Sequence, residues 1–299
     1  MRVVVAGSSG LIGTALVRAF RADGAEVVRL VRRVPASPDE ARWDPTRPEP
    51  GLLGDVDVVV NLGGAGLGDH RWTRAYREEI ASSRTQTTKT LAAMAARADQ
   101  PPRVLISMSG IRYYGVERGQ ELLTESSDPG FDGFLPRVTH AWEEATAEAQ
   151  QAGVRVCHLR TGLILASAGG LLPRLTPWFQ SGLGAVLGPR NAFWSYLTLH
   201  DATDAIRFLT QNTEIDGPVN LTAPNPVRAG DFARALAEAH GHRARLRAPL
   251  WALRIAQGHM APEVLGSLRV IPTRLTDAGF RFRHPTITAA LAAEVRSCG

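Results

Sequence analysis

The first twenty residues read MRVVVAGSSGLIGTALVRAF, and this stretch, residues 1–20, decides the fold. An apolar run typical of a buried strand, Val3–Ala6, leads directly into glycines at positions 7, 10 and 13 and then into an amphipathic helical pattern. With this spacing the first glycine makes a tight turn, the second lets backbone N–H groups approach a pyrophosphate, and the third lets the helix pack on the strand. The helix N-terminus then faces the phosphate charge.

The stretch therefore predicts a dinucleotide site built from Gly7, Ser8, Ser9, Gly10, Leu11, Ile12 and Gly13. The alternative is a glycine turn that only connects a strand to a helix. A Walker A phosphate loop is excluded, because no Lys-Ser or Lys-Thr follows the last glycine.

Beyond this unit, short β-branched runs alternate with longer amphipathic stretches over the first two thirds of the chain. This alternation is typical of strand, crossover helix and parallel strand. It predicts an α/β fold with a Rossmann-type doubly wound parallel sheet, and helices that start near residues 11, 71 and 136. The predicted strands are Val3–Ala6, Glu26–Val31, Val56–Asn61, Val104–Ser107 and Val154–Leu159.

The local composition of the sequence changes at about residue 166, where Gly, Pro and Trp begin to interrupt the apolar pattern. We therefore expect a Rossmann core at residues 1–165 and a smaller C-terminal substrate region at residues 166–299. Periodic apolar positions return further on, so residues from about 193 to 222 are expected to rejoin the core.

Composition limits the partners of this 299-residue chain. It carries 34 Lys+Arg against 29 Asp+Glu, a net charge of +5, and only two cysteines. The basic residues are scattered, which argues against nucleic acid. The two cysteines form no C-x-x-C pair and have no His at ligand spacing, so the sequence shows no zinc site. No apolar run reaches the roughly 20 residues of a membrane helix, and no signal peptide precedes the first strand. We expect a cytoplasmic protein with a small-molecule substrate, and neither nucleic acid nor membrane as a partner.

The end of the second predicted strand bears on the choice of cofactor. An NAD site usually places a carboxylate on the adenosine ribose about 20 residues beyond the glycines, but here the chain reads Val31-Arg32-Arg33. A guanidinium can bind a 2′-phosphate through two hydrogen bonds and stack on the adenine. The residues favour NADP(H) over NAD, with Arg32 as the first candidate and Arg33 as the second. Two solvated arginines at a strand end are the alternative.

A series of short segments occurs in a specific order along nearly the whole chain: the glycine turn, Asn61–Gly64, Arg71–Trp72, Ser83–Thr85, Ser107–Gly115, Leu159–Gly162 and Asn220–Pro226. Together they resemble the atypical, extended short-chain dehydrogenases/reductases of the group usually labelled epimerase family. A C-terminal stretch, from Ile271-Pro272 through Ala278-Gly279-Phe280 to Pro285, is similar to that group's small domain of undefined function, at about residues 245–295.

The resemblance implies an NADP-binding protein and adds residues to the predicted cofactor site. Leu62 and Gly63 would line the adenosine side of the cleft, and the Thr161–Ile164 stretch would lie beside the nicotinamide. Glu79 and Arg84 match positions that border the cofactor, although Glu79 can also be read as an exposed helix acid. The residues added in this way are Leu62, Gly63, Glu79, Arg84, Ser107, Arg160, Thr161, Gly162 and Ile164.

The catalytic residues of the group are only partly present. Short-chain reductases protonate the developing alkoxide with a Tyr whose pKa is lowered by a Lys four residues later, while a Ser orients the substrate oxygen. By resemblance Ser109 is that serine, but Leu135 and Thr139 stand where the Tyr and the Lys belong. The chain's single lysine lies upstream, so the usual pair cannot form. Tyr113 and Tyr114 are the nearest phenols that could donate the proton; packing under the nicotinamide is the alternative.

Three functions follow as hypotheses. The first is an NADP-dependent oxidoreductase of the extended short-chain type that acts on a small carbonyl or alcohol. The second is a non-catalytic NADP(H)-binding regulatory protein, because the usual Tyr and Lys are missing. The third is a sugar-nucleotide epimerase, to which the same objection applies.

Overall fold

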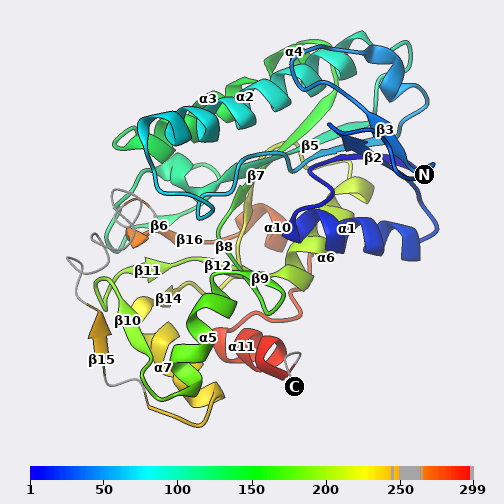
Figure 1. Cartoon of the computed structure of the whole chain (residues 1–299). Helices are drawn as coiled ribbons and strands as arrows, with labels where there is room; N and C mark the ends of the chain where they lie inside the picture. The colour runs from blue at the N-terminus through cyan, green and yellow to red at the C-terminus, as the bar shows by residue number, and fades with distance from the viewer. Residues whose placement is uncertain (244–245, 249–262, 264, 297–299) are drawn as a thin grey trace. The chain divides into compact units, whose positions relative to one another are not determined.

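The computed structural model describes residues 1–243, 246–248, 263 and 265–296 (Figure 1). The chain forms two compact units that are interleaved in the sequence. The first contains Met1–Gly110, Val138–Arg160 and Thr203–Val219, and the second contains Ile111–Arg137, Thr161–Ala202 and Asn220–Gly299.

A seven-stranded sheet forms the centre of the first unit. Its order from edge to edge is β13 (Gly217–Leu221), β7 (Arg155–Thr161), β5 (Val104–Gly110), β4 (Val58–Asn61), β1 (Arg2–Ala6), β2 (Glu26–Val31) and β3 (Glu40–Arg42). The pairs β1/β2, β1/β4, β2/β3 and β4/β5 are all parallel. Val3, Val4 and Val5 are at most 1% exposed, because the sheet is covered on both faces. The predicted Rossmann-type α/β fold is confirmed.

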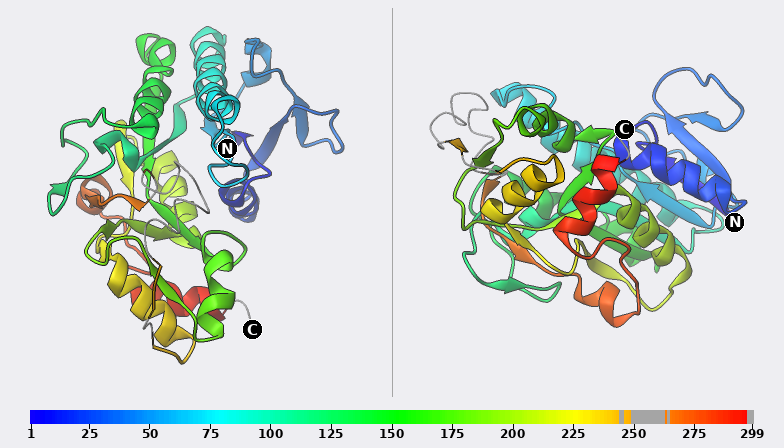
Figure 2. Two further views of the ribbon diagram at one scale, coloured as in Figure 1. Left: turned by 60° about the vertical axis from the view of Figure 1, so that its left-hand side comes forward. Right: turned by 90° about the horizontal axis from the view of Figure 1, so that it is seen from below.

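Helices cover both faces of this sheet. Figures 1 and 2 show α1 (Leu11–Ala22) and α6 (Leu199–Gln211) on one face, and α2 (Arg74–Arg97), α3 (Phe134–Glu144) and α4 (Ala147–Gln151) on the other. The buried residues of α1 are spaced three or four apart and form one helix face: Gly13, Leu16, Val17 and Phe20. A short 3-10 helix, Pro50–Leu53, completes this unit.

The carboxyl ends of the central strands lie level with one another. Ala6 at the end of β1 pairs with Leu30 of β2 and with Asn61 of β4, and Asn61 pairs in turn with Ser107 of β5. Because β1 lies between β2 and β4, the chain turns to opposite sides from it. Open parallel sheets bind ligands at such a switch point, beyond the carboxyl ends of the strands.

The second unit consists of short strands and helices. Its core includes a cluster of Ile111, Tyr114, Leu123, Leu268 and Val270. Its elements among the described residues are η2 (Ile111–Tyr114), β6 (Leu122–Leu123), β8 (Leu163–Ala166), β9 (Gly169–Gly170), α5 (Leu172–Gln180), β10 (Ala185–Leu187), β11 (Phe193–Trp194), β12 (Tyr196–Thr198), β14 (Val227–Arg228), α7 (Ala229–Ala239), β15 (Leu246–Ala248), β16 (Arg269–Val270), α10 (Thr273–Asp277) and α11 (Ile287–Arg296).

The predicted elements of the first unit are present with small shifts in their ends. The third predicted strand begins at Val58 rather than Val56, and α2 begins at Arg74, where the Thr73 side chain accepts a hydrogen bond from Tyr76 N–H. The sequence pattern places a boundary near residue 165, whereas the units interleave because residues 203–219 pack with the large sheet and residues 111–137 with the second unit.

Two sequence features fall wholly or partly outside the described residues. Cys157 is buried and its Sγ donates to the Ile215 oxygen at 3.3 Å, whereas Cys298 lies outside them. The predicted family-specific domain, residues 245–295, is described only at 246–248, 263 and 265–295. Within the described ranges, none of the helices is both long enough and apolar enough to cross a membrane.

Candidate cofactor and catalytic site

The glycine turn is packed so tightly that two of its positions have no room for a side chain. Gly7 has a φ of +77°, and a Cβ there would lie 2.6 Å from the carbonyl carbon of Leu62. A Cβ on Gly13 would lie 2.2 Å from the Gly7 oxygen. The turn, the start of α1 and the end of β4 are therefore in close contact, as the predicted phosphate turn requires.

The N-terminus of α1 is open to an anion. Gly10 is its N-cap, no side chain caps the helix, and the first turn contains no acidic residue. The first intrahelical hydrogen bond runs from Thr14 N–H to the Gly10 oxygen at 2.9 Å. The partial positive charge of the helix end and its early amides therefore suit a phosphate group.

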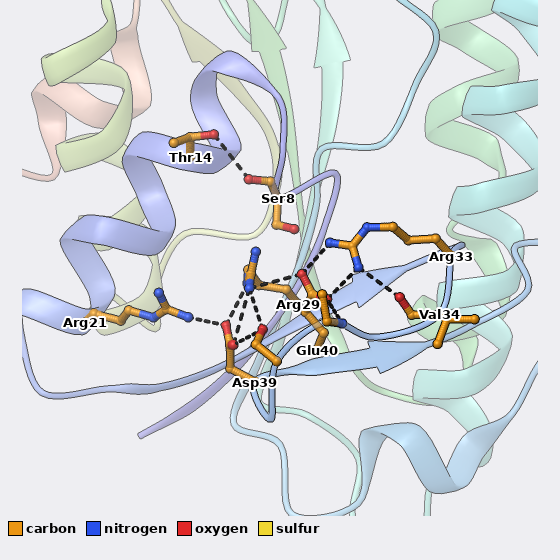
Figure 3. Close-up of polar contacts among 10 residues, drawn as sticks. Ser8, Thr14, Arg21, Arg29, Arg33, Val34, Asp39 and Glu40 are labelled. Carbon is orange, nitrogen blue, oxygen red and sulfur yellow. Dashed lines mark hydrogen bonds and ion pairs between the residues drawn. The ribbon is translucent and has the colours of Figure 1, made fainter.

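The two arginines after β2 differ in their surroundings. Arg33 donates through both terminal nitrogens to Glu40, each at 2.7 Å (Figure 3). Arg32 is exposed, and it forms neither a hydrogen bond nor an ion pair with any residue that the structure describes. Arg32 is thus the guanidinium available to a ligand, while Arg33 is engaged by the protein.

A buried polar chain supports the loop after β4. Asn61 Oδ1 accepts from Gly63 N–H at 3.1 Å, and Asn61 Nδ2 donates to Thr88 Oγ1 at 2.7 Å. Trp142 Nε1 donates to the same Thr88 hydroxyl at 2.8 Å. Leu62 and Gly63 are half-buried. Both predicted residues therefore lie on a fixed backbone beside the glycine turn.

Arg84 is a buried cation on α2. It is 9% exposed, its Nη1 donates to the Ile80 oxygen at 3.0 Å, and its guanidinium lies 5.1 Å from the centre of the Trp142 ring. Burial lowers the pKa of Arg84 to about 10. No carboxylate of the described residues pairs with it, so an anionic ligand would compensate its charge. Glu79, the other predicted residue of this helix, is exposed.

A buried charge cluster occupies the ends of β5 and β7. Arg160 Nε and Nη2 donate to the two carboxylate oxygens of Glu143, each at 2.9 Å, and Ser109 Oγ donates to Glu143 Oε1 at 2.7 Å. Ser109 and Arg160 are each 3% exposed. The Ser109 hydroxyl and the Arg160 guanidinium are thus engaged by Glu143, and their predicted substrate and cofactor contacts stay predictions.

His158 adjoins this cluster. One ring nitrogen, Nε2, lies 2.8 Å from Thr146 Oγ1, and the other, Nδ1, lies 3.9 Å from Glu143 Oε2. Burial lowers the pKa of His158, while Glu143 raises it and Arg160 lowers it further.

We expect His158 to make the fold less stable in acid. Below its ordinary pKa of about 6.5, the unfolded chain takes up a proton that the folded chain excludes, so the free energy of unfolding falls. Urea titrations between pH 7 and pH 5 should show a steeper loss for the wild type than for His158→Gln, which can keep a hydrogen bond to Thr146. Equal slopes would contradict this assignment.

Ser107 carries an orphaned polar atom. Its side chain is 1% exposed on β5, and its Oγ has no hydrogen-bond partner among the described residues. Buried hydroxyls are rarely left in this state, so the position is compatible with a ligand contact.

The other predicted residues belong to the second unit. Tyr114 is fully buried and its hydroxyl donates to Asn220 Oδ1 at 2.7 Å, whereas Tyr113 is half-buried. Their rings meet edge to face with centroids 5.5 Å apart. Thr161, Gly162 and Ile164 are half-buried, and Gly162 N–H donates to the Leu221 oxygen at 3.1 Å.

The helix that carries the Tyr and the Lys in ordinary short-chain reductases offers neither group here. Leu135 and Thr139 of α3 are each 5% exposed and fill buried positions. The residue of this helix that sequence reasoning missed is Glu143, four residues after Thr139, which binds Ser109 and Arg160. Its spacing from Thr139 is visible in the sequence, but its partners Ser109 and Arg160 come from two other strands.

Comparison with known proteins found two matching family models. Residues 3–222 match the NAD dependent epimerase/dehydratase family, and residues 248–294 match a domain of unknown function, DUF1731. The chain is 42% identical to the epimerase family protein Mb2239 of Mycobacterium bovis, over 97% of this chain and 96% of that protein.

Two solved structures share the fold over 99% of this chain. One is the human epimerase family protein SDR39U1 with NADPH, at 27% identity and a TM-score of 0.90, covering 99% of that chain. The other is a nucleoside-diphosphate sugar epimerase from Corynebacterium glutamicum, at 36% identity and a TM-score of 0.82, of which this chain spans 58%.

Proposed function

The chain belongs to the NAD dependent epimerase/dehydratase family, and from that premise we propose that it binds NADP(H) and acts as an NADP-dependent oxidoreductase on a small carbonyl or alcohol. The observation that carries the proposal is the glycine cradle, in which Gly7 and Gly13 leave no room for a Cβ at the open N-terminus of α1. The structural neighbour with NADPH supports the choice of the phosphorylated cofactor.

Each group of residues has a proposed task toward the cofactor. The early amides of α1 hold the pyrophosphate, and the Arg32 guanidinium binds the 2′-phosphate. Leu62 and Gly63 line the adenosine side, and the uncompensated cation of Arg84 adds positive charge near the same strand ends. Ser107, Thr161, Gly162 and Ile164 are the proposed neighbours of the nicotinamide. When bound, the nicotinamide supplies or accepts a hydride.

Tyr113 is the better candidate for the proton donor. The Tyr114 hydroxyl already donates to Asn220 and is fully buried, which removes it from any substrate. Tyr113 is half-buried and packs against the core of its own unit, which restrains its ring. We therefore assign the acid to Tyr113 and a structural hydrogen bond to Tyr114.

Arg32→Ala is the experiment that tests the cofactor proposal. We expect NADPH to bind about 30-fold more weakly, because a charge-assisted contact to phosphate is worth roughly 2 kcal/mol, while the affinity for NADH stays within about twofold. Isothermal titration or fluorescence titration measures both constants. Arg18→Ala is the matched control, because Arg18 is an exposed arginine on α1. Equal losses for NADPH and NADH, or no loss, would contradict the role of Arg32.

The second candidate, a non-catalytic NADP(H)-binding regulatory protein, is favoured by Leu135 and Thr139 in place of the usual Tyr and Lys. The nucleoside-diphosphate sugar epimerase among the neighbours keeps the third candidate open. A panel of aldehydes, ketones and quinones with NADPH, together with UDP-sugars, separates the three. Oxidation of NADPH supports the oxidoreductase, sugar epimerisation supports the third candidate, and tight NADPH binding without either supports the regulatory protein.

A further inference from the structure

The buried carboxylate of Glu40 on β3 holds the first part of the loop after β2 (Figure 3). The Glu40 side chain is 2% exposed. Its Oε1 lies 2.7 Å from Arg33 Nη2 and 3.1 Å from Arg29 Nη2, and its Oε2 accepts from Arg33 Nη1 and from Ala36 N–H, each at 2.7 Å. Glu40 therefore holds both a side chain and a backbone amide of the loop.

Asp39 is the neighbouring carboxylate and binds different groups. It accepts from Arg29 Nε at 2.6 Å, from Ser37 Oγ at 2.6 Å and from Arg21. It contacts neither Arg33 nor the Ala36 amide. Asp39 thus joins Arg29 of β2 to Arg21 of α1, whereas Glu40 binds Arg33 and the Ala36 amide and so holds the loop from Arg33 to Ala36 against β3.

Arg32 lies between the end of β2 and the two loop residues that Glu40 holds. Trp43 N–H donates to the Val31 oxygen at 3.0 Å, which fixes the backbone just before Arg32. Ordering a free loop costs roughly 1–2 kcal/mol per residue, and a ligand would have to supply that free energy on binding. Because Glu40 orders the loop before a ligand binds, Arg32 can bind a phosphate without this loss of conformational entropy.

The charge of the network fits a phosphate. Arg21, Arg29, Arg32 and Arg33 carry four positive charges, and Asp39 and Glu40 carry two negative ones, which leaves an excess of two. A phosphate monoester carries about −1.5 to −2 at neutral pH. The hydrogen bonds from Arg33 and then from Ala36 lower the pKa of Glu40 to about 2, so this carboxylate stays ionised at neutral pH.

We propose that Glu40 is a positioning residue for recognition of the 2′-phosphate of NADP(H): it binds Arg33 and the Ala36 amide and thereby fixes Arg32 at the carboxyl end of β2. Arg33 is then a structural partner of Glu40 and Arg32 the direct phosphate ligand. This inference rests on the proposed function, because it concerns the same cofactor site.

The test compares Glu40→Gln with Asp39→Asn in titrations of the full chain with NADPH and with NADH. Coulomb's law alone predicts that removal of either negative charge tightens NADPH binding. The positioning role predicts the opposite sign for Glu40→Gln: about tenfold weaker NADPH binding with NADH unchanged, while Asp39→Asn binds NADPH as well as or better than the wild type. In an Arg32→Ala background, Glu40→Gln should have no further effect on NADPH.

The outcomes separate this inference from the proposed function. Tighter or unchanged NADPH binding by Glu40→Gln, in a protein that prefers NADPH through Arg32, overturns the positioning role alone. Equal weakening for NADPH and NADH also overturns it, because it would show a general loss of structure. A wild-type protein that does not prefer NADPH overturns the cofactor proposal and this inference with it.

Discussion

Glu143→Ala is expected to lower the free energy of unfolding by about 3–5 kcal/mol. The substitution leaves the Arg160 guanidinium, which is 3% exposed, without its two-point partner, and it removes the acceptor of the Ser109 hydroxyl. A buried charge that loses its partner is far costlier than the loss of an exposed ion pair. Urea-induced unfolding, followed by tryptophan fluorescence and circular dichroism, measures the difference.

Two further variants show whether the loss of the Glu143 carboxylate beside Arg160 is the cause. Glu143→Gln keeps the shape and one acceptor oxygen, so it should cost less than Glu143→Ala. The double variant Glu143→Ala, Arg160→Ala removes both charges and should be destabilised by clearly less than the sum of the two single variants. A loss below about 1 kcal/mol for Glu143→Ala would argue that water reaches the cluster and that the ion pair behaves as a surface pair.

Tyr113→Phe is expected to lower kcat by about 100-fold or more with the carbonyl that the wild type reduces fastest. Loss of a general acid typically costs two to four orders of magnitude in rate, and the hydroxyl is the only group that this substitution removes. NADPH affinity should not change, because the proposed cofactor contacts lie elsewhere. Stopped-flow oxidation of NADPH under single-turnover conditions measures the chemical step separately from product release.

Tyr114→Phe is the matched control for this experiment. It removes the hydrogen bond to Asn220 in the core of the second unit, so we expect a stability loss of about 1 kcal/mol and an unchanged kcat. The opposite pattern, with Tyr114→Phe slow and Tyr113→Phe normal, would exchange the two roles. If neither variant affects turnover, the proton comes from a group other than these two phenols.

The glycine turn of the proposed cofactor site could be predicted from the sequence because its geometry is local. The glycine turn needs three glycines at a fixed spacing between a strand and a helix, and all of them lie within seven residues. The absence of the usual Tyr and Lys on α3 could also be predicted, because composition alone excludes a lysine downstream of Ser109. Such features depend on neighbours along the chain rather than on distant partners.

Two other features could not be predicted. β3 has only three residues, one of them the charged Glu40, so it is too short for a hydrophobic periodicity that would predict a strand. The sequence analysis favours Arg32 over Arg33 as the phosphate ligand, but nothing local says which of the two meets a carboxylate from the next strand. The interleaving of the units arises in the same way, because it depends on which distant segments bury their apolar faces together.

The sequence by itself determined that this chain builds a parallel α/β sheet with a tight glycine turn after its first strand, since periodicity and glycine spacing act over a few residues. Only the tertiary structure decided that Arg33 is held by Glu40 while Arg32 is left available, that Ser109 and Arg160 share Glu143, and that Tyr114 is bonded to Asn220. The reason is physical. A buried charge or hydroxyl pairs with a group from whichever element the fold places beside it, and the residues next to it in the sequence do not specify that group.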